Sequence, residues 1–135
     1  MADHSKSSLV KKLGIKPGDK LLLVNIPENY DSLIDQWPDE IVLISEEEGE
    51  EIDFIHFFTQ DMAELEIKFP NLKKKLRKGG GFWVSWPKSR SKLQKDLNGN
   101  DVRRIGFETG LVDVKVCAVD EGWSGIKFMY RLKDR

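Results

Sequence analysis

Polar side chains that can contact a ligand recur directly after the predicted strands of this chain. The turn from Asn25 to Tyr30 follows one apolar run, Ser45-Glu46 follows the next, and Thr59 follows a third. The carboxyl ends of parallel strands meet at one edge of a sheet, where open α/β sheets bind their ligands. We therefore expect a ligand crevice at this edge. Its candidate residues are Asn25, Pro27, Glu28, Asn29, Tyr30, Ser45, Glu46, Thr59, Ser85, Trp86, Lys88 and Arg90.

The first of these turns contains no glycine. It reads Asn-Ile-Pro-Glu-Asn-Tyr over residues 25–30. A nucleotide-binding α/β domain places glycines here, because its backbone must approach the ligand closely. Pro27 also lacks a backbone donor. The sequence thus predicts the scaffold of a cofactor-binding domain without the ordinary cofactor turn.

The remaining reactive side chains are few. His56 lies inside an apolar run, where it could act as a general base; a hydrogen-bonded histidine packed within the sheet is the interpretation we favour. Two histidines and the single Cys117 are too few and too far apart for a zinc site, and we expect no metal. No serine or cysteine lies in a recognisable nucleophile motif, and we name no catalytic residue.

Two charged segments and three tryptophans leave alternatives open. The loop Lys88–Lys92 can receive a phosphate or carboxylate, or it is a solvated loop. The acidic run 46–51 is predicted to be a solvated loop, with cation binding as the alternative. Trp83 and Trp86 must point to opposite faces of a strand because their separation is odd. Trp123 either packs onto the sheet, which we favour, or serves as a ligand platform; an exposed Trp123 would be an anchor for a partner.

Length, charge and hydropathy argue against several classes of protein. The chain has 135 residues, which predicts one domain over 1–135, and its net charge of −1 provides no basic field for nucleic acid. No apolar run approaches the roughly 18 residues that span a bilayer. Met1 to Ser8 lacks the apolar core of a signal peptide, so we expect a cytoplasmic protein that contacts no membrane. We expect residues 1–6 to be disordered.

Apolar runs and helical periodicity alternate along the chain. Strands are predicted at 21–24, 41–44, 53–58 and 82–86, with helices at 8–13, 28–37, 60–76 and 98–109. Pro70 should break or kink the third helix near Phe69. Residues 113–117 and 126–133 alternate and are joined by a short glycine-bearing segment, which predicts an antiparallel hairpin at a sheet edge. That edge offers a surface for a homodimer.

This order predicts a doubly wound α/β fold. Strand–helix alternation favours right-handed crossovers and a mostly parallel sheet between helices. We expect about six strands, with the hairpin as an antiparallel C-terminal addition.

Several motifs resemble the class I S-adenosylmethionine methyltransferases. They are Lys16-Pro17-Gly18-Asp19-Lys20 before the first strand, Asp53-Phe54-Ile55, Leu76-Arg77-Lys78-Gly79-Gly80-Gly81 and Gly110-Leu111-Val112-Asp113-Val114. The resemblance covers residues 12–132 and implies a Rossmann-like fold. On this alignment the family's acidic residue falls on Leu23 and its three glycines fall on Asn25, Pro27 and Asn29. Glu46 stands where the family holds ribose hydroxyls.

The chain is also similar to a family of short bacterial proteins known as a domain of unknown function. That likeness is carried by Phe82–Lys88 and Ala118–Gly125 and implies no activity. Together, the two likenesses and the missing glycines predict a non-catalytic, methyltransferase-like domain. It would bind a partner protein or a small ligand at the crevice and need no cofactor.

Two alternatives remain. A divergent enzyme would bind S-adenosylmethionine or another nucleotide through Asn25, Asn29, Ser45 and Glu46. Lys88 or His56 would then lie near its substrate. A purely structural module would oligomerise through the hairpin edge.

Overall fold

The computed structural model describes residues 8–88 and 97–135. The expected disorder of residues 1–6 therefore lies outside the described residues, as does Arg90 of the basic loop. In chain order the elements are α1 (Leu9–Leu13), β1 (Lys20–Val24), α2 (Tyr30–Ile34), β2 (Val42–Leu43), β3 (Ile52–Phe58), α3 (Met62–Lys75), β4 (Leu76–Pro87), α4 (Gly99–Glu108), β5 (Leu111–Ala118), β6 (Trp123–Tyr130) and a 3₁₀ turn (Leu132–Asp134).

Six strands form one sheet in the order β2-β1-β3-β4-β6-β5. The strands from β2 to β4 run parallel, whereas β6 pairs antiparallel with both β4 and β5. This confirms the predicted mostly parallel α/β fold with an antiparallel C-terminal hairpin. Because β6 lies inside the sheet, only β5 of the hairpin forms an edge.

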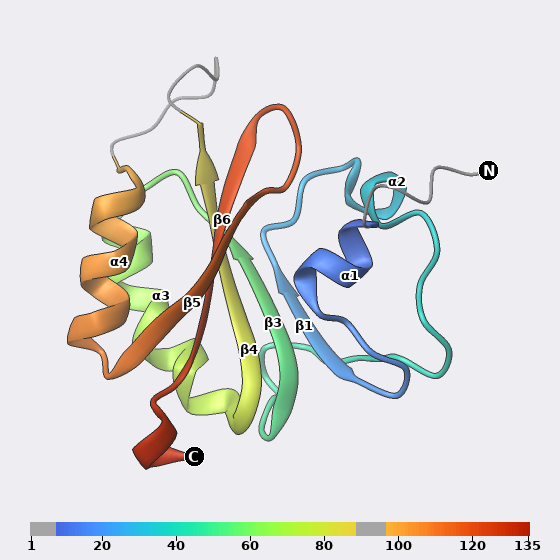
Figure 1. The fold of residues 1–135 in the computed structure, drawn as a ribbon, viewed down its shortest axis with the longest axis horizontal. Helices are drawn as coiled ribbons and strands as arrows, with labels where there is room; N and C mark the ends of the chain where they lie inside the picture. Colours follow the sequence, from blue (N-terminus) through green and yellow to red (C-terminus); the bar gives the residue numbers. More distant parts are fainter. Residues whose placement is uncertain (1–7, 89–96) are drawn as a thin grey trace.

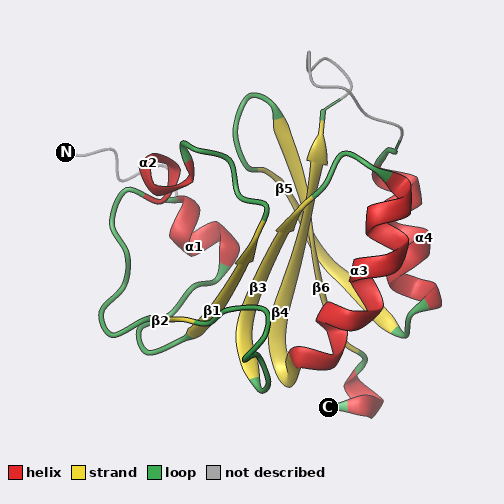
Figure 2. Ribbon diagram, turned by 180° about the vertical axis from the view of Figure 1, so that it is seen from behind, coloured by secondary structure: helices red, strands yellow, loops and turns green. Residues whose placement is uncertain are grey.

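Helices cover both faces of the sheet. The short helices α1 and α2 lie on one face, and α3 and α4 lie on the other (Figures 1 and 2). Each face has its own apolar core: Trp83 belongs to the α1/α2 core and Trp86 to the α3/α4 core. The odd spacing of these tryptophans predicts this division. No helix in the described part of the chain is long and apolar enough to cross a membrane.

Side-chain caps hold the starts of α1, α3 and α4. Ser8 Oγ accepts a hydrogen bond from the Lys11 amide at the start of α1. Asn98 caps α4 in a reciprocal capping box with Asp101. Each cap satisfies backbone donors that have no partner within the helix.

Of the break or kink predicted at Pro70, the break is wrong. Helix α3 runs without interruption from Met62 to Lys75 and contains Pro70. Phe69 and Leu72 on either side are fully buried against the sheet. The packing of this helix face outweighs the backbone hydrogen bond that proline removes.

Three other boundaries differ from the prediction. The strand predicted at 82–86 is longer: β4 begins at Leu76, directly after α3, and Leu76–Gly81 form its first half. A Cβ on Gly80 would lie 2.8 Å from the Asp53 carbonyl oxygen, so glycine allows the strands to approach there. The predicted helix 28–37 is reduced to the five residues of α2, and β2 has two residues, both exposed.

Candidate functional site

A cavity opens at the carboxyl ends of β1 and β3, at the predicted edge of the sheet. Its volume is about 380 Å³, within the range of small-molecule pockets. Strand ends, the start of α3 and the start of β6 all contribute to its wall. The lining residues are Asn25, Pro27, Phe58, Thr59, Gln60, Asp61, Glu64 and Trp123.

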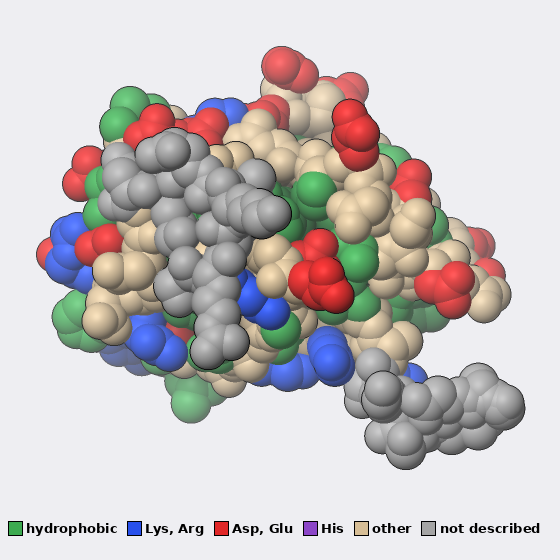
Figure 3. Space-filling view, turned by 90° about the horizontal axis from the view of Figure 1, so that it is seen from above, with side chains coloured by type: hydrophobic (Ala, Val, Ile, Leu, Met, Phe, Trp, Pro, Cys, Tyr) green, Lys and Arg blue, Asp and Glu red, His purple; other side chains and the backbone are tan. Residues whose placement is uncertain are grey.

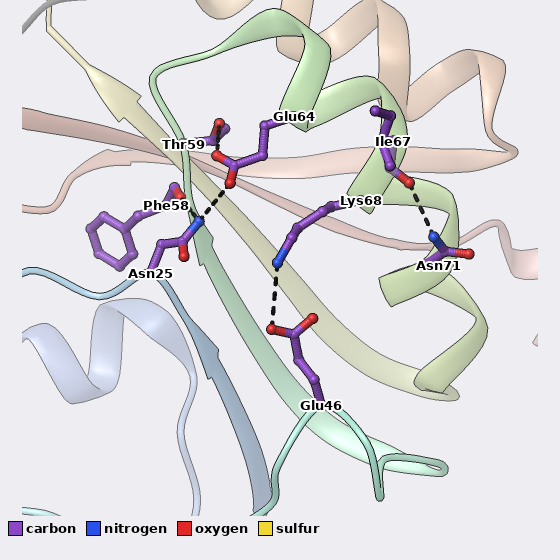
Figure 4. A network of polar contacts seen from close by, with 8 residues as sticks. All are labelled: Asn25, Glu46, Phe58, Thr59, Glu64, Ile67, Lys68 and Asn71. Atoms are coloured by element: carbon purple, nitrogen blue, oxygen red, sulfur yellow. Dashed lines mark hydrogen bonds and ion pairs between the residues drawn. The ribbon is translucent and has the colours of Figure 1, made fainter.

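Asn25 stands at the first of the glycine positions and keeps a left-handed backbone, with φ +58°. Asparagine tolerates this conformation better than most residues. Its Nδ2 donates to the Phe58 carbonyl oxygen and to Glu64 Oε2, both at 3.1 Å (Figure 4). The side chain therefore ties the end of β1 to the end of β3 and to α3.

Glu64 is fixed by a second donor. The Thr59 hydroxyl donates to Glu64 Oε1 at 2.7 Å, and Thr59 itself is only 2% exposed. Asp61 caps α3 by accepting from the Ala63 amide at 2.9 Å. Two carboxylates are thus oriented at the cavity wall before any ligand arrives.

Trp123, the first residue of β6, supplies an aromatic wall to the cavity. Its ring meets Phe58 edge-to-face, with centroids 5.0 Å apart. Asp120 Oδ1 accepts from the Trp123 amide at 2.9 Å and fixes the turn. Trp123 therefore packs onto the sheet, as the first of its two interpretations predicts, and at the same time lines the cavity.

The lining of the cavity is suited to a positively charged ligand. Within the described residues, the charged side chains of the wall are Asp61 and Glu64, both acidic. Figure 3 looks onto this end of the molecule, where acidic, basic and apolar side chains are all exposed. Carboxylates beside an aromatic ring suit an organic cation through charge-assisted hydrogen bonds and cation–π contact.

Glu46 does not line this cavity. Its carboxylate forms an ion pair with Lys68 of α3 at 3.5 Å (Figure 4). Ser45 donates to Glu48 Oε1 at 3.1 Å. The acidic run is thus partly engaged by its own neighbours. The described residues contain no group of three or more His, Cys, Asp and Glu side chains that could hold a metal ion.

His56, Tyr30 and Ser85 form a hydrogen-bonded chain in the interior. The Tyr30 hydroxyl lies 2.8 Å from His56 Nδ1, and Ser85 Oγ lies 2.8 Å from Nε2. His56 and Ser85 are both 0% exposed. Burial lowers the pKa of His56 to about 3, so the ring is neutral near pH 7. This matches the packed histidine favoured from the sequence.

The other sequence candidates among the described residues do not line this cavity. Glu28 and Asn29 are exposed, and Asn29 makes no side-chain cap to α2. Trp86 packs in the α3/α4 core rather than in the cavity. The Lys88 amide donates to the Gly122 carbonyl oxygen at 2.9 Å. Of the eleven candidates that lie within the described residues, the cavity brings together Asn25, Pro27 and Thr59.

Glu64 lines the cavity but is not among the residues predicted for this edge of the sheet. Asp61 and Glu64 have the spacing of a helix cap and its third helical residue, a pattern that marks a helix start. That signal places Glu64 on the first turn of α3, directly beside the end of β3.

Comparison with known proteins establishes the fold of this chain and nothing beyond it. No protein-family model and no curated protein matches the chain. A methyltransferase from Aquifex aeolicus described as S-adenosylmethionine-dependent superposes with a TM-score of 0.65 at 14% identity, covering 91% of this chain and 88% of that one. Aeropyrum pernix fibrillarin, in complex with S-adenosylmethionine, gives 0.62 at 14% identity, with coverages of 90% and 73%.

A third solved structure agrees with these two. Magnesium protoporphyrin IX methyltransferase from Synechocystis, with bound S-adenosylhomocysteine, gives a TM-score of 0.61 at 8% identity, covering 91% of this chain and 78% of that one. At these identities the likeness concerns architecture alone. The chain therefore has a methyltransferase-like α/β fold.

Proposed function

We propose that this chain is a methyltransferase-like binding domain that holds a small, positively charged organic ligand in the cavity between β1, β3 and Trp123, and that it transfers no group. The observation that carries the proposal is the pairing of two oriented carboxylates, Asp61 and Glu64, with the Trp123 ring. Such a wall attracts a cation by charge and by the electron-rich ring face.

The Asn25 bridge argues against the ordinary cofactor mode. In an α/β cofactor site, glycine lets the backbone of this turn approach the ligand. Here the Asn25 amide occupies that approach and is bonded to both Phe58 and Glu64. Glu46 is likewise paired with Lys68 instead of being free for ribose hydroxyls.

S-adenosylmethionine itself is the second candidate ligand. Asn25 keeps the left-handed backbone that glycine adopts readily, so the turn retains part of its cofactor-binding shape. The sulfonium centre of this molecule is also a small organic cation. A divergent enzyme would then use the same cavity.

Thermal unfolding with a panel of ligands tests the proposal. We would use choline, S-adenosylmethionine, S-adenosylhomocysteine and ATP. A ligand at about 100 times its dissociation constant adds about 2.7 kcal/mol, which raises the Tm of a 135-residue domain by about 10 °C. We expect choline or S-adenosylmethionine to raise the Tm, and S-adenosylhomocysteine, which lacks the sulfonium charge, to do so much less. No response to either cation would refute the proposal.

A matched pair of variants locates the effect. Glu64→Gln removes the charge at the cavity wall, whereas Glu66→Gln removes an exposed charge from the same helix. We expect the first to weaken cation binding about tenfold or more and the second to leave it unchanged. Transfer of a labelled methyl group from S-adenosylmethionine to any component of a cell extract, dependent on Glu64, would contradict the non-catalytic part.

A further inference from the structure

A second, smaller cavity lies at the opposite end of the sheet. It has a volume of about 140 Å³ and opens beside the amino ends of β1, β3 and β4, on the face that α1 covers. This is enough space for several water molecules or one small ion. The lining combines the end of α1 with charged residues of four segments: Leu13, Gly14, Lys16, Asp19, Asp53, Phe54, Arg77, Gly79, Gly81, Lys127 and Met129.

Lys127 of β6 reaches into this cavity across two glycines. A Cβ on Gly81 would lie 2.6 Å from Lys127 Cε, and one on Gly14 would lie 3.0 Å from Lys127 Nζ. Any side chain at either position would displace the lysine. Because Gly14 and Gly81 have no side chain, the half-buried ammonium group of Lys127 fits between them.

The neighbouring acceptors at the end of α1 are already occupied. Trp83 Nε1 donates to the Leu13 carbonyl oxygen at 2.8 Å, and Lys115 Nζ donates to the Lys12 carbonyl oxygen at 2.7 Å. Lys127 forms no hydrogen bond or ion pair with any residue in 8–88 or 97–135. Its ammonium group therefore has donors to offer.

The two carboxylates of the cavity are also engaged. Asp53 accepts from the Lys20 amide at 2.8 Å and forms an ion pair with Arg77. Asp19 accepts from the Lys16 amide at 2.9 Å. With three cations against two acids in the lining, the cavity carries a net positive charge.

We propose that this cavity is a binding site for a small oxyanion, either a phosphate or a carboxylate, held on the ammonium group of Lys127. Three observations support this inference. Gly14 and Gly81 leave space for Lys127, the ammonium group has N–H donors without a partner among the described residues, and the lining carries a net positive charge. This site is independent of the cation-binding cavity, because it lies at the other end of the sheet and shares no lining residue with it.

The charges that face Lys127 support the same ligand. Burial lowers the pKa of Lys127, and the ammonium groups of Lys115 and Lys16 lower it further, while Asp19 opposes them. A bound anion relieves this repulsion between cations. Binding should therefore weaken as the pH rises through the pKa of Lys127.

Thermal unfolding in matched salts tests the site. Wild-type protein and Lys127→Met would be compared in sodium phosphate, sodium acetate and sodium chloride at one ionic strength. Methionine keeps an unbranched chain over Gly81 and removes the charge. Lys133→Met, at an exposed lysine of the terminal 3₁₀ turn, is the control. We expect phosphate or acetate to stabilise wild type and the control beyond chloride, with affinity at least about tenfold lower in Lys127→Met.

The outcomes are distinguishable. A stronger response to phosphate identifies a phosphoryl ligand, and a stronger response to acetate identifies a carboxylate. Equal stabilisation of wild type and Lys127→Met would be a general salt effect and would overturn the proposal. If Lys127→Met does not fold, amide chemical shifts of the wild type decide: shifts at Gly79 and Gly81 support the site, and shifts confined to other residues overturn it.

Discussion

The buried ring of His56 predicts a specific loss of stability in acid. Burial lowers its pKa from 6.5 to about 3. In the unfolded chain the ring takes up a proton near pH 6.5, whereas in the folded protein it stays neutral. The unfolded state therefore binds more protons between these pH values, and stability falls as the pH falls through this window.

The size of the effect follows from the pKa difference. Each pH unit within the window costs about 1.4 kcal/mol, so acidification from pH 7 to pH 4.5 removes about 2–3 kcal/mol through His56 alone. This is a large share of the stability of a small domain. Carboxylates contribute their own acid dependence, so the His56 contribution must be isolated by comparison with a variant.

Urea unfolding of wild type and His56→Gln between pH 7 and pH 4.5 isolates the contribution of His56 to the pH dependence of stability. Glutamine offers a donor and an acceptor to Tyr30 and Ser85 but takes up no proton. We expect the free energy of unfolding of wild type, relative to that of His56→Gln, to fall by about 2–3 kcal/mol over this range. A stability difference between wild type and His56→Gln that does not change with pH would refute the reasoning.

Three further substitutions test the packing and the helix ends, each by urea unfolding. Asn98→Ala removes the cap of α4 and should cost about 1 kcal/mol, whereas Asn100→Ala, at an exposed helical position, should cost less. Gly106→Ala would place a Cβ 2.1 Å from Phe128 Cε1 and should cost about 1–3 kcal/mol through overpacking. Pro70→Ala should raise the free energy of unfolding by about 1–3 kcal/mol, because it restores a helical hydrogen bond; no gain would mean that α3 already accommodates the proline.

Much of the fold can be predicted from the sequence because its signals are local. Apolar runs indicate the parallel strands, and alternation indicates the hairpin of β5 and β6. Pro70 shows the limit of such signals. Whether a proline ends a helix depends on how strongly its neighbours pack, and the burial of Phe69 and Leu72 is a tertiary property.

The place of the cavity at the carboxyl ends of the strands could be predicted from the sequence, but its lining only in part. The ends of β1 and β3 place Asn25 and Thr59 at the edge of the sheet where the cavity opens. Tyr30 and Ser85 turn inward instead, because each satisfies a nitrogen of the buried His56 ring. These hydrogen bonds join segments that are far apart in the chain, so no local sequence pattern predicts them. Trp123 reaches the cavity only because β6 lies beside β4, which fixes the position of the start of β6.

Isothermal titration calorimetry of the wild type with choline and with S-adenosylmethionine tests the central claim most directly. The account predicts saturable binding of at least one of these cations. It also predicts binding about tenfold or more weaker in Glu64→Gln and unchanged in Glu66→Gln. Binding that is equally strong in Glu64→Gln, or no heat from either cation at millimolar concentration, would contradict it.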